Sequence, residues 1–169
     1  PGIPDRHPVF AAAHLVGASI LDESDLAAAW DQRPWCAVTG TNGKTTVVTL
    51  VARMLEYSGR RVATAGNIET PLVVAIDDPE VEAFVVEASS FRLGHARCFN
   101  AAPAAWINFA PDHLDHHASL DAYFMAKARI WEGISDPKDA IAYLADPVLS
   151  KQAPPGATGF GSATSACRI

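Results

Sequence analysis

The chain has 169 residues, of which 49% are hydrophobic and 19% charged, a composition ordinary for one globular domain. Its formal charge of -6 and the lack of a basic cluster disfavour nucleic acid as the main partner, because contacts to phosphates need clustered Lys and Arg. No apolar run approaches the ~18 residues that span a bilayer, and no signal segment opens the chain. We therefore expect a cytoplasmic protein without a membrane partner.

Short apolar runs alternate with amphipathic segments along the chain, which predicts an α/β fold with a mainly parallel sheet flanked by helices. Helices are expected over residues 8–16 and 23–30, followed by a buried strand over 35–39. The next helix begins after a Gly-rich loop and ends at Gly59. Its expected core face consists of apolar residues at helical spacing, namely Val47, Leu50, Val51, Met54 and Leu55.

The remaining elements continue this alternation. Ser119 is expected to cap a helix over residues 120–132, and Thr70 to cap a helix that opens with Pro71 and runs to Ile76. The expected strands are 61–65, 83–86, 104–107, 140–144 and 158–160. Three cysteines (Cys36, Cys98 and Cys167) match no metal or disulfide spacing, so reduced thiols are expected.

The Gly-rich loop Gly40-Thr41-Asn42-Gly43-Lys44-Thr45-Thr46 joins a predicted strand to a predicted helix. Backbone N–H groups in such a turn, together with the helix N-terminus, form a cradle for phosphate oxygens. Lys44 would neutralise the β- and γ-phosphates and the Thr45 hydroxyl would reach Mg²⁺. The strict Walker pattern is not met, because Val38 stands where its first Gly belongs. The alternative is a surface turn that happens to contain a lysine.

Two acidic features follow other predicted strands. Glu87 ends one strand and could hold Mg²⁺ beside the phosphates, although a Glu there could instead complement a helix dipole. The run Asp112-His113-Leu114-Asp115-His116-His117 follows another strand, and could be a zinc site or a polar loop that caps the next helix. Because parallel strands share one crevice at their carboxyl ends, we expect the loop, Glu87, and Asp112 with His113 to converge.

Lys127 lies on the apolar face of the predicted helix over residues 120–132. That face is marked by Leu120, Tyr123, Phe124, Ile130 and Trp131. Burial of a lysine lowers its pKa, and the neutral amine can react with carbon dioxide to form a carbamate, an anionic oxygen ligand for Mg²⁺. The alternative reading, favoured by the residues alone, is a lysine whose stem packs while its ammonium reaches water.

Five motifs in order resemble those of the Mur ligases of peptidoglycan synthesis, and the similarity runs from the first residue to about residue 160. They are the loop at 40–46, Gly66-Asn67-Ile68, Glu87-Ala88-Ser89-Ser90-Phe91-Arg92-Leu93, Asn108 with Asp112-His113-Leu114-Asp115, and the Tyr123 to Arg129 helix with Lys127. Pro1-Gly2-Ile3 with His7-Pro8 also resembles the segment that closes the family's first domain. Phe91 and Gly66-Asn67-Ile68 favour the branch that adds D-glutamate to UDP-N-acetylmuramoyl-L-alanine.

The resemblance implies a P-loop-type central domain that uses ATP and two Mg²⁺ ions. Lys44 would act on the transferred phosphoryl group, and Thr45 with Glu87 would hold one Mg²⁺. His113 and carbamylated Lys127 would hold the second. Asn67 and Ser89 are implied to face the muramoyl substrate.

The resemblance also implies a truncated chain. Residues 1–33 would be the end of an N-terminal domain with linker helices, and 34–169 an ATP-binding central domain incomplete at its C-terminus. Without the N- and C-terminal domains we expect no ligation by this chain alone. Arg92 in place of the family's usual Gln, and Glu69-Thr70 in place of a Gly, put substrate contacts in question. Other readings are a Mur ligase that adds the third residue, a non-ligase P-loop nucleotide-binding module, or a zinc hydrolase built on His113 to His117.

Overall fold

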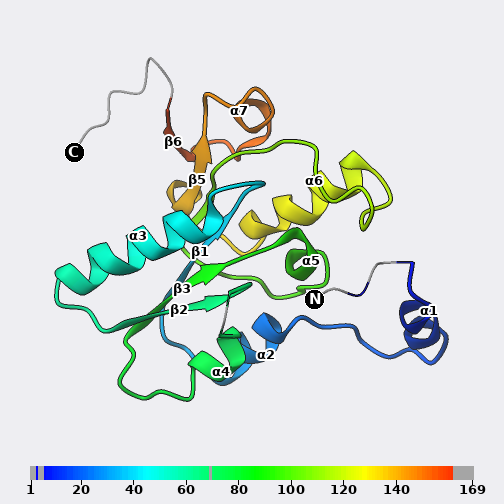
Figure 1. The fold of residues 1–169 in the computed structure, drawn as a ribbon, viewed down its shortest axis with the longest axis horizontal. Helices are drawn as coiled ribbons and strands as arrows, with labels where there is room; N and C mark the ends of the chain where they lie inside the picture. Colours follow the sequence, from blue (N-terminus) through cyan, green and yellow to red (C-terminus); the bar gives the residue numbers. More distant parts are fainter. Residues whose placement is uncertain (1–2, 4–5, 69, 162–169) are drawn as a thin grey trace.

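The computed structural model describes residue 3 and residues 6–68 and 70–161. A six-stranded sheet with every neighbouring pair parallel forms its centre, in the order β2-β3-β1-β4-β5-β6 (Figure 1). The strands are β1 (Trp35–Thr39), β2 (Val62–Gly66), β3 (Ala83–Glu87), β4 (Ala104–Trp106), β5 (Ala140–Tyr143) and β6 (Thr158–Phe160). The predicted α/β class with a parallel sheet is confirmed.

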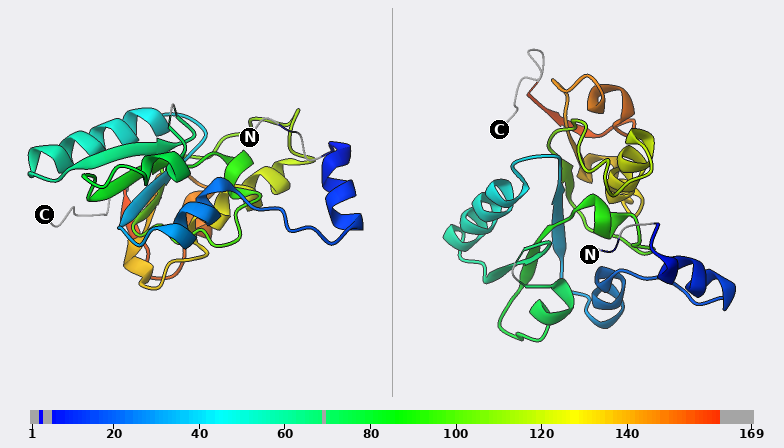
Figure 2. Two further views of the ribbon diagram at one scale, coloured as in Figure 1. Left: turned by 90° about the horizontal axis from the view of Figure 1, so that it is seen from below. Right: turned by 45° about the vertical axis from the view of Figure 1, so that its right-hand side comes forward.

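Helices cover both faces of this sheet (Figures 1 and 2). They are α1 (Pro8–Leu15), α2 (Glu23–Trp30), α3 (Lys44–Tyr57), α4 (Leu72–Ala75), α5 (Ser90–Leu93), α6 (Leu120–Ala128), α7 (Leu149–Gln152) and the 3₁₀ turns η1 (Arg129–Trp131) and η2 (Pro137–Asp139). Neighbouring β1 residues point to opposite faces, since Val38 packs with α3 whereas Ala37 packs in the larger core under α2, α4 and α5. No helix among the described residues is long and apolar enough to cross a membrane.

The strand order places the carboxyl ends of β3, β1 and β4 side by side, because β1 pairs with both β3 and β4. The chain passes from β3 to β4 across β1, which makes this edge the switch point of the sheet. Ligands of open parallel sheets bind outside the strand ends at such a point. The fold therefore offers a crevice where the Gly-rich loop after β1 begins.

The predicted core face of α3 was partly wrong. Val48 and Ala52 are buried against β1 and β3, whereas Leu50 is 57% and Met54 70% exposed. The small side chains of Val48 and Ala52 let the helix lie close to the strands. Val47, Val51 and Leu55 pack against this cluster as predicted, so only Leu50 and Met54 were misplaced.

The prediction that Thr70 caps a helix was also wrong. The helix α4 begins at Leu72 with Pro71 in the N-cap position, and Pro71 has no side chain that can accept a hydrogen bond. The carboxylate of Glu23, on α2, accepts from the backbone N–H groups of Leu72 (3.2 Å) and Val73 (2.7 Å) instead. A capping group so far away along the chain is not visible in a local pattern.

The helix after Ser119 is confirmed, including its cap, because the Ser119 hydroxyl accepts from the Ala122 N–H at 3.0 Å. It is shorter than expected, since α6 ends at Ala128 and continues only as the 3₁₀ turn η1. Leu120, placed on the apolar face by the sequence, is 38% exposed at the first turn. The single-turn helices α5, α7 and η2 were not predicted, because one turn carries too little periodicity.

Candidate active site

The loop between β1 and α3 has the backbone geometry that the sequence predicted. Gly43 lies at the N-cap of α3 with a φ of 78°, a conformation that side chains rarely adopt. At Gly40, an added Cβ would lie 2.6 Å from Cγ1 of Ile107. The close approach to Ile107 therefore favours glycine at position 40, and the positive φ favours it at position 43. The N–H groups of the first turn of α3 open toward the carboxyl edge of the sheet.

Asn108, two residues after β4, fixes the conformation of this loop. Its Oδ1 accepts from the N–H groups of Thr41 (2.8 Å) and Asn42 (3.0 Å), while its Nδ2 donates to the Asn42 carbonyl (2.9 Å). In the sequence analysis Asn108 appeared only as part of a motif, and no role was predicted for it. Its position just beyond a strand that neighbours β1 is the signal that could have identified it.

A hydroxyl, a carboxylate and an amide side chain meet beside the loop, from Thr45, Glu87 and Asn67. The Thr45 hydroxyl donates to Glu87 Oε2 at 2.6 Å, and Asn67 Nδ2 lies 3.3 Å from Glu87 Oε1. The main chain also joins the ends of β2 and β3, because Asn67 N–H donates to the Glu87 carbonyl at 2.8 Å. Gly66 permits this approach, since a Cβ there would lie 2.4 Å from that carbonyl oxygen. Thr45 of the loop and Glu87 therefore meet as expected, and Asn67 joins them, which the convergence prediction did not include.

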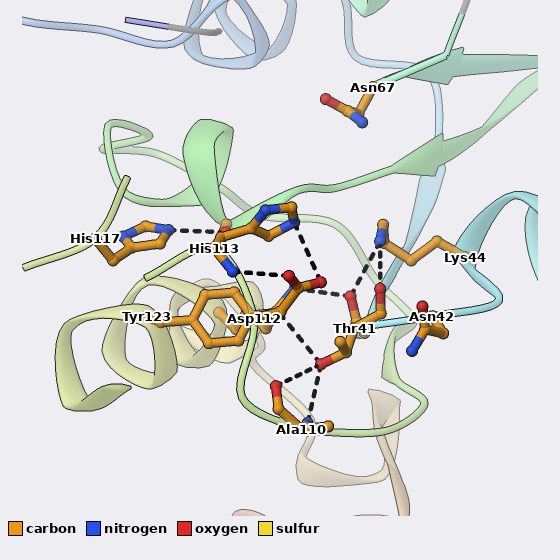
Figure 3. Close-up of polar contacts among 12 residues, drawn as sticks. Thr41, Asn42, Lys44, Asn67, Ala110, Asp112, His113, His117 and Tyr123 are labelled. Atoms are coloured by element: carbon orange, nitrogen blue, oxygen red, sulfur yellow. Dashed lines mark hydrogen bonds and ion pairs between the residues drawn. The ribbon is translucent and has the colours of Figure 1, made fainter. Parts of the chain in front are cut away.

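Two lysines contact the same backbone oxygen of the loop. The Gly40 carbonyl accepts from Lys127 Nζ at 2.8 Å and from Lys44 Nζ at 3.2 Å. Lys44 Nζ also donates to the Thr41 carbonyl at 3.1 Å (Figure 3). The side chains expected to handle phosphate and carbamate chemistry therefore lie on one side of the crevice.

Lys127 is buried, with only 1% of its surface exposed. Burial, followed by the charge of Lys44, lowers the pKa of Lys127 to about 7. Its Nζ lies 3.5 Å from the Thr39 hydroxyl and 4.9 Å from the centre of the Tyr123 ring. The alternative in which the ammonium reaches water was wrong, and a neutral amine is accessible near neutral pH.

His113 also contacts the Tyr123 ring. The two ring centres are 6.0 Å apart, and His113 Nε2 lies 3.6 Å from Asp112 Oδ2 (Figure 3). A φ of 54° turns the backbone at His113, whose N–H donates to Asp112 Oδ1 at 2.8 Å. The Tyr123 hydroxyl lies 3.2 Å from the Thr41 hydroxyl. Tyr123 therefore connects the phosphate loop with both His113 and Lys127, a role that the sequence did not predict.

The other two histidines of the run make hydrogen bonds and ring contacts. His117 is 5% exposed, and its Nε2 lies 2.9 Å from the Ser90 hydroxyl. Its ring and that of His116 contact Phe91. Across the described ranges, no group of three or more His, Cys, Asp or Glu side chains could hold a metal ion. This part of the chain offers no support for the zinc reading.

Ser89, expected on the substrate side, lies two residues after the end of β3 and is buried. Its hydroxyl accepts from the Arg92 N–H at 3.4 Å as the N-cap of α5. Ser89 therefore lies beside Glu87 at the crevice while its side chain is used to start a helix. Among the cysteines, Cys36 and Cys98 are free thiols, and burial raises the pKa of Cys36. Cys167 lies outside the described residues.

Comparisons with known proteins agree with this arrangement. The sequence profile of the Mur ligase middle domain matches residues 38–166. UDP-N-acetylmuramoylalanine–D-glutamate ligase of Frankia casuarinae is 45% identical over 133 residues, covering 78% of this chain and 28% of that protein. The enzyme of the same name from Streptomyces coelicolor is 42% identical over 142 residues, covering 79% of this chain and 30% of that protein. The chain thus spans less than a third of the length of these two relatives.

Solved structures show the same fold. The MurF ligase from Thermotoga maritima, solved in complex with ADP, superposes with a TM-score of 0.62 at 22% identity, covering 80% of this chain and 34% of that one. A UDP-N-acetylmuramoyl-L-alanyl-D-glutamate–2,6-diaminopimelate ligase gives a TM-score of 0.56 at 26% identity, covering 76% and 31%. With the family profile matching more than half of its residues, this chain belongs to the Mur ligase family and carries the family's middle domain.

Proposed function

We propose that this chain is the ATP- and Mg²⁺-binding part of a ligase that adds D-glutamate to UDP-N-acetylmuramoyl-L-alanine. The observation that carries the proposal is the meeting of four groups around one loop. Lys44 and Lys127 share the Gly40 carbonyl, while Thr45 lies against Glu87 on the other side. The sequence identity to ligases of that name supports the D-glutamate branch.

The residues suit a reaction through an acyl phosphate. ATP would transfer its γ-phosphoryl group to the carboxylate of the muramoyl substrate, and the amine of D-glutamate would displace phosphate to form the amide. Lys44 would stabilise the charge of the transferred group, because an ammonium placed at the loop needs no reorganisation during transfer. Asn67 and Ser89 would lie on the substrate side of the crevice, next to Glu87.

The donors present fit magnesium. Mg²⁺ prefers hard oxygen ligands, and the Thr45 hydroxyl and the buried Glu87 carboxylate supply two at hydrogen-bonding distance from each other. His113 and Lys127 would hold a second ion, with Lys127 as a carbamate formed when its amine attacks carbon dioxide and loses a proton. Such ions neutralise phosphate charge.

Other parts of the proposal rest on family resemblance. Residues 1–33 would end an N-terminal domain and link it to the central domain at 34–169. The partners of the whole enzyme would be the family's other domains and its substrates, UDP-N-acetylmuramoyl-L-alanine and D-glutamate. A cytoplasmic location belongs to the same proposal. The second candidate function is a Mur ligase that adds the third residue of the peptide, and the 26% identity to a diaminopimelate ligase favours it.

Carbamate formation distinguishes a ligase site from a P-loop module that only binds nucleotide. With ¹³C-labelled bicarbonate at pH 8, we expect one carbamate carbon signal from the wild-type chain, because the pKa of Lys127 near 7 leaves its amine largely neutral. The signal should be absent from Lys127→Ala and present in Lys151→Ala, which removes an exposed lysine. A signal that persists in Lys127→Ala, or none in the wild type, would count against the ligase assignment of this lysine.

A further inference from the structure

Arg92, which stands where the family usually has Gln, is buried between helices. It belongs to α5 and is 8% exposed. Its Nη1 forms an ion pair with Glu23 Oε1 and lies 3.8 Å from Asp22 Oδ1, both at the start of α2. Within the described ranges its Nε has no hydrogen-bond partner. The guanidinium charge is therefore balanced by carboxylates of one distant helix.

The Glu23 carboxylate has a second set of partners. It accepts from the N–H groups of Leu72 (3.2 Å) and Val73 (2.7 Å), which open α4. This carboxylate is the cap of α4, because Pro71 provides none. The helix α4 comes directly after the segment that carries Asn67, so the position of Glu23 bears on that segment.

Arg92 is connected to Ser89, the other substrate-side residue, through its own backbone. Its backbone N–H donates to the Ser89 hydroxyl at 3.4 Å, which starts α5 just beyond Glu87. One ion pair thus joins the segment after β2, which carries Asn67, to the segment after β3, which carries Ser89. Both segments border Glu87, since Asn67 also contacts its carboxylate.

We propose that Arg92 and Glu23 are positioning residues that set the spacing of Asn67 and Ser89, and through them the substrate side of the crevice. The inference rests on the proposed function for the role of that side as the muramoyl site. Glutamine at position 92 would carry no charge and could not neutralise a carboxylate that is largely removed from water. The carboxylate would keep only its two backbone donors, and the loss of one partner of a buried ion pair is strongly unfavourable, so the segments would rearrange.

The matched control is Arg33, another arginine that ties α2 to the α4 region. It pairs with Asp31 and donates to the carbonyls of Ile76, Asp78 and Val81, beyond the far end of α4. Arg33→Gln should therefore lower stability without displacing Asn67 or Ser89. A difference between Arg92→Gln and Arg33→Gln separates positioning from a general loss of stability.

The test uses amide NMR of this chain. In Arg92→Gln we expect shifted resonances of Asn67, including its side-chain amide, and of Ser89. Hydrogen exchange at Leu72 and Val73 should become about tenfold faster, since losing a helix cap costs about that factor. In a titration with UDP-N-acetylmuramoyl-L-alanine, the midpoint read at Asn67 should rise about tenfold or more. Arg33→Gln should match the wild type in the Asn67 and Ser89 resonances, in hydrogen exchange at Leu72 and Val73, and in the titration midpoint.

The outcomes are distinguishable. Asn67 and Ser89 resonances that move no more in Arg92→Gln than in Arg33→Gln would overturn the positioning role. A wild-type chain that binds neither Mg·ATP nor the muramoyl nucleotide would contradict the proposed function. The Asn67 and Ser89 resonances of the variants would still show whether the Arg92–Glu23 ion pair positions these residues. If Arg92→Gln fails to fold, Arg92→Lys retains the charge and Glu23→Gln removes its partner. We then expect Arg92→Lys to stay near the wild type and Glu23→Gln to shift Asn67, and the reverse pattern would refute the proposal.

Discussion

Replacing Lys127 with methionine is expected to raise the free energy of unfolding at pH 6 by about 3–5 kcal/mol, an effect that fades as the pH rises. Burial lowers the pKa of Lys127 from 10.5 to about 7. Between these values the unfolded chain binds more protons than the folded one, so wild-type stability rises with pH. The penalty for a buried charge is complete below pH 7, and methionine, of similar length, removes it while losing the bond to Gly40.

Urea unfolding of both proteins from pH 6 to 10, in bicarbonate-free buffer, measures this effect. The advantage of Lys127→Met should be largest at pH 6 to 7 and should shrink steadily toward pH 10. Lys151→Met, at an exposed position, should follow the wild type throughout. Parallel curves for wild type and Lys127→Met would show that Lys127 is not a buried, neutral amine.

Replacing Lys44 with alanine is expected to weaken binding of Mg·ATP by about 100-fold, because charge-assisted hydrogen bonds to phosphate contribute ~1.5–3 kcal/mol each. The Lys44 ammonium contacts the Gly40 and Thr41 carbonyls, so it lies at the mouth of the glycine loop. Stability should change little, since those two contacts leave the ammonium partly exposed to water.

Calorimetric titration of Mg·ATP into the two proteins gives the comparison. Lys138→Ala is a suitable control, because Lys138 is exposed on η2, outside the crevice. It should retain wild-type affinity. Affinity of Lys44→Ala within about threefold of the wild type would mean that the loop does not bind the phosphates.

The sequence predicted the parts of the site that follow from strand ends and helix periodicity. Glu87 ends a strand, Lys44 and His113 lie in segments that follow strands, and parallel strands bring their ends to one edge. The helical stripe placed Lys127 on the apolar face, although the residues alone favoured an ammonium that reaches water. Lys127 is 1% exposed in the structure, so its ammonium group does not reach water.

The contacts that the sequence did not predict join residues far apart in the chain. Asn108 clamps Asn42 across 66 positions, and Glu23 caps α4 from 49 positions away. Such pairs depend on how α2, β1 and β4 pack, and no local spacing encodes that packing. The face of α3 was predicted only in part, because Val48 and Ala52 are the residues it buries most deeply while Leu50 and Met54 are exposed.

The central claim is that Glu87 and Thr45 hold the magnesium of a bound ATP, and affinity measured with and without Mg²⁺ tests it most directly. Wild-type protein should bind ATP at least about tenfold more tightly with Mg²⁺ than in EDTA, as a charged ligand contact of ~1.4 kcal/mol requires. Glu87→Gln should lose most of this gain while keeping its affinity in EDTA, and Glu132→Gln, an exposed control, should keep the gain. An equal Mg²⁺ enhancement in Glu87→Gln and wild type would contradict the account.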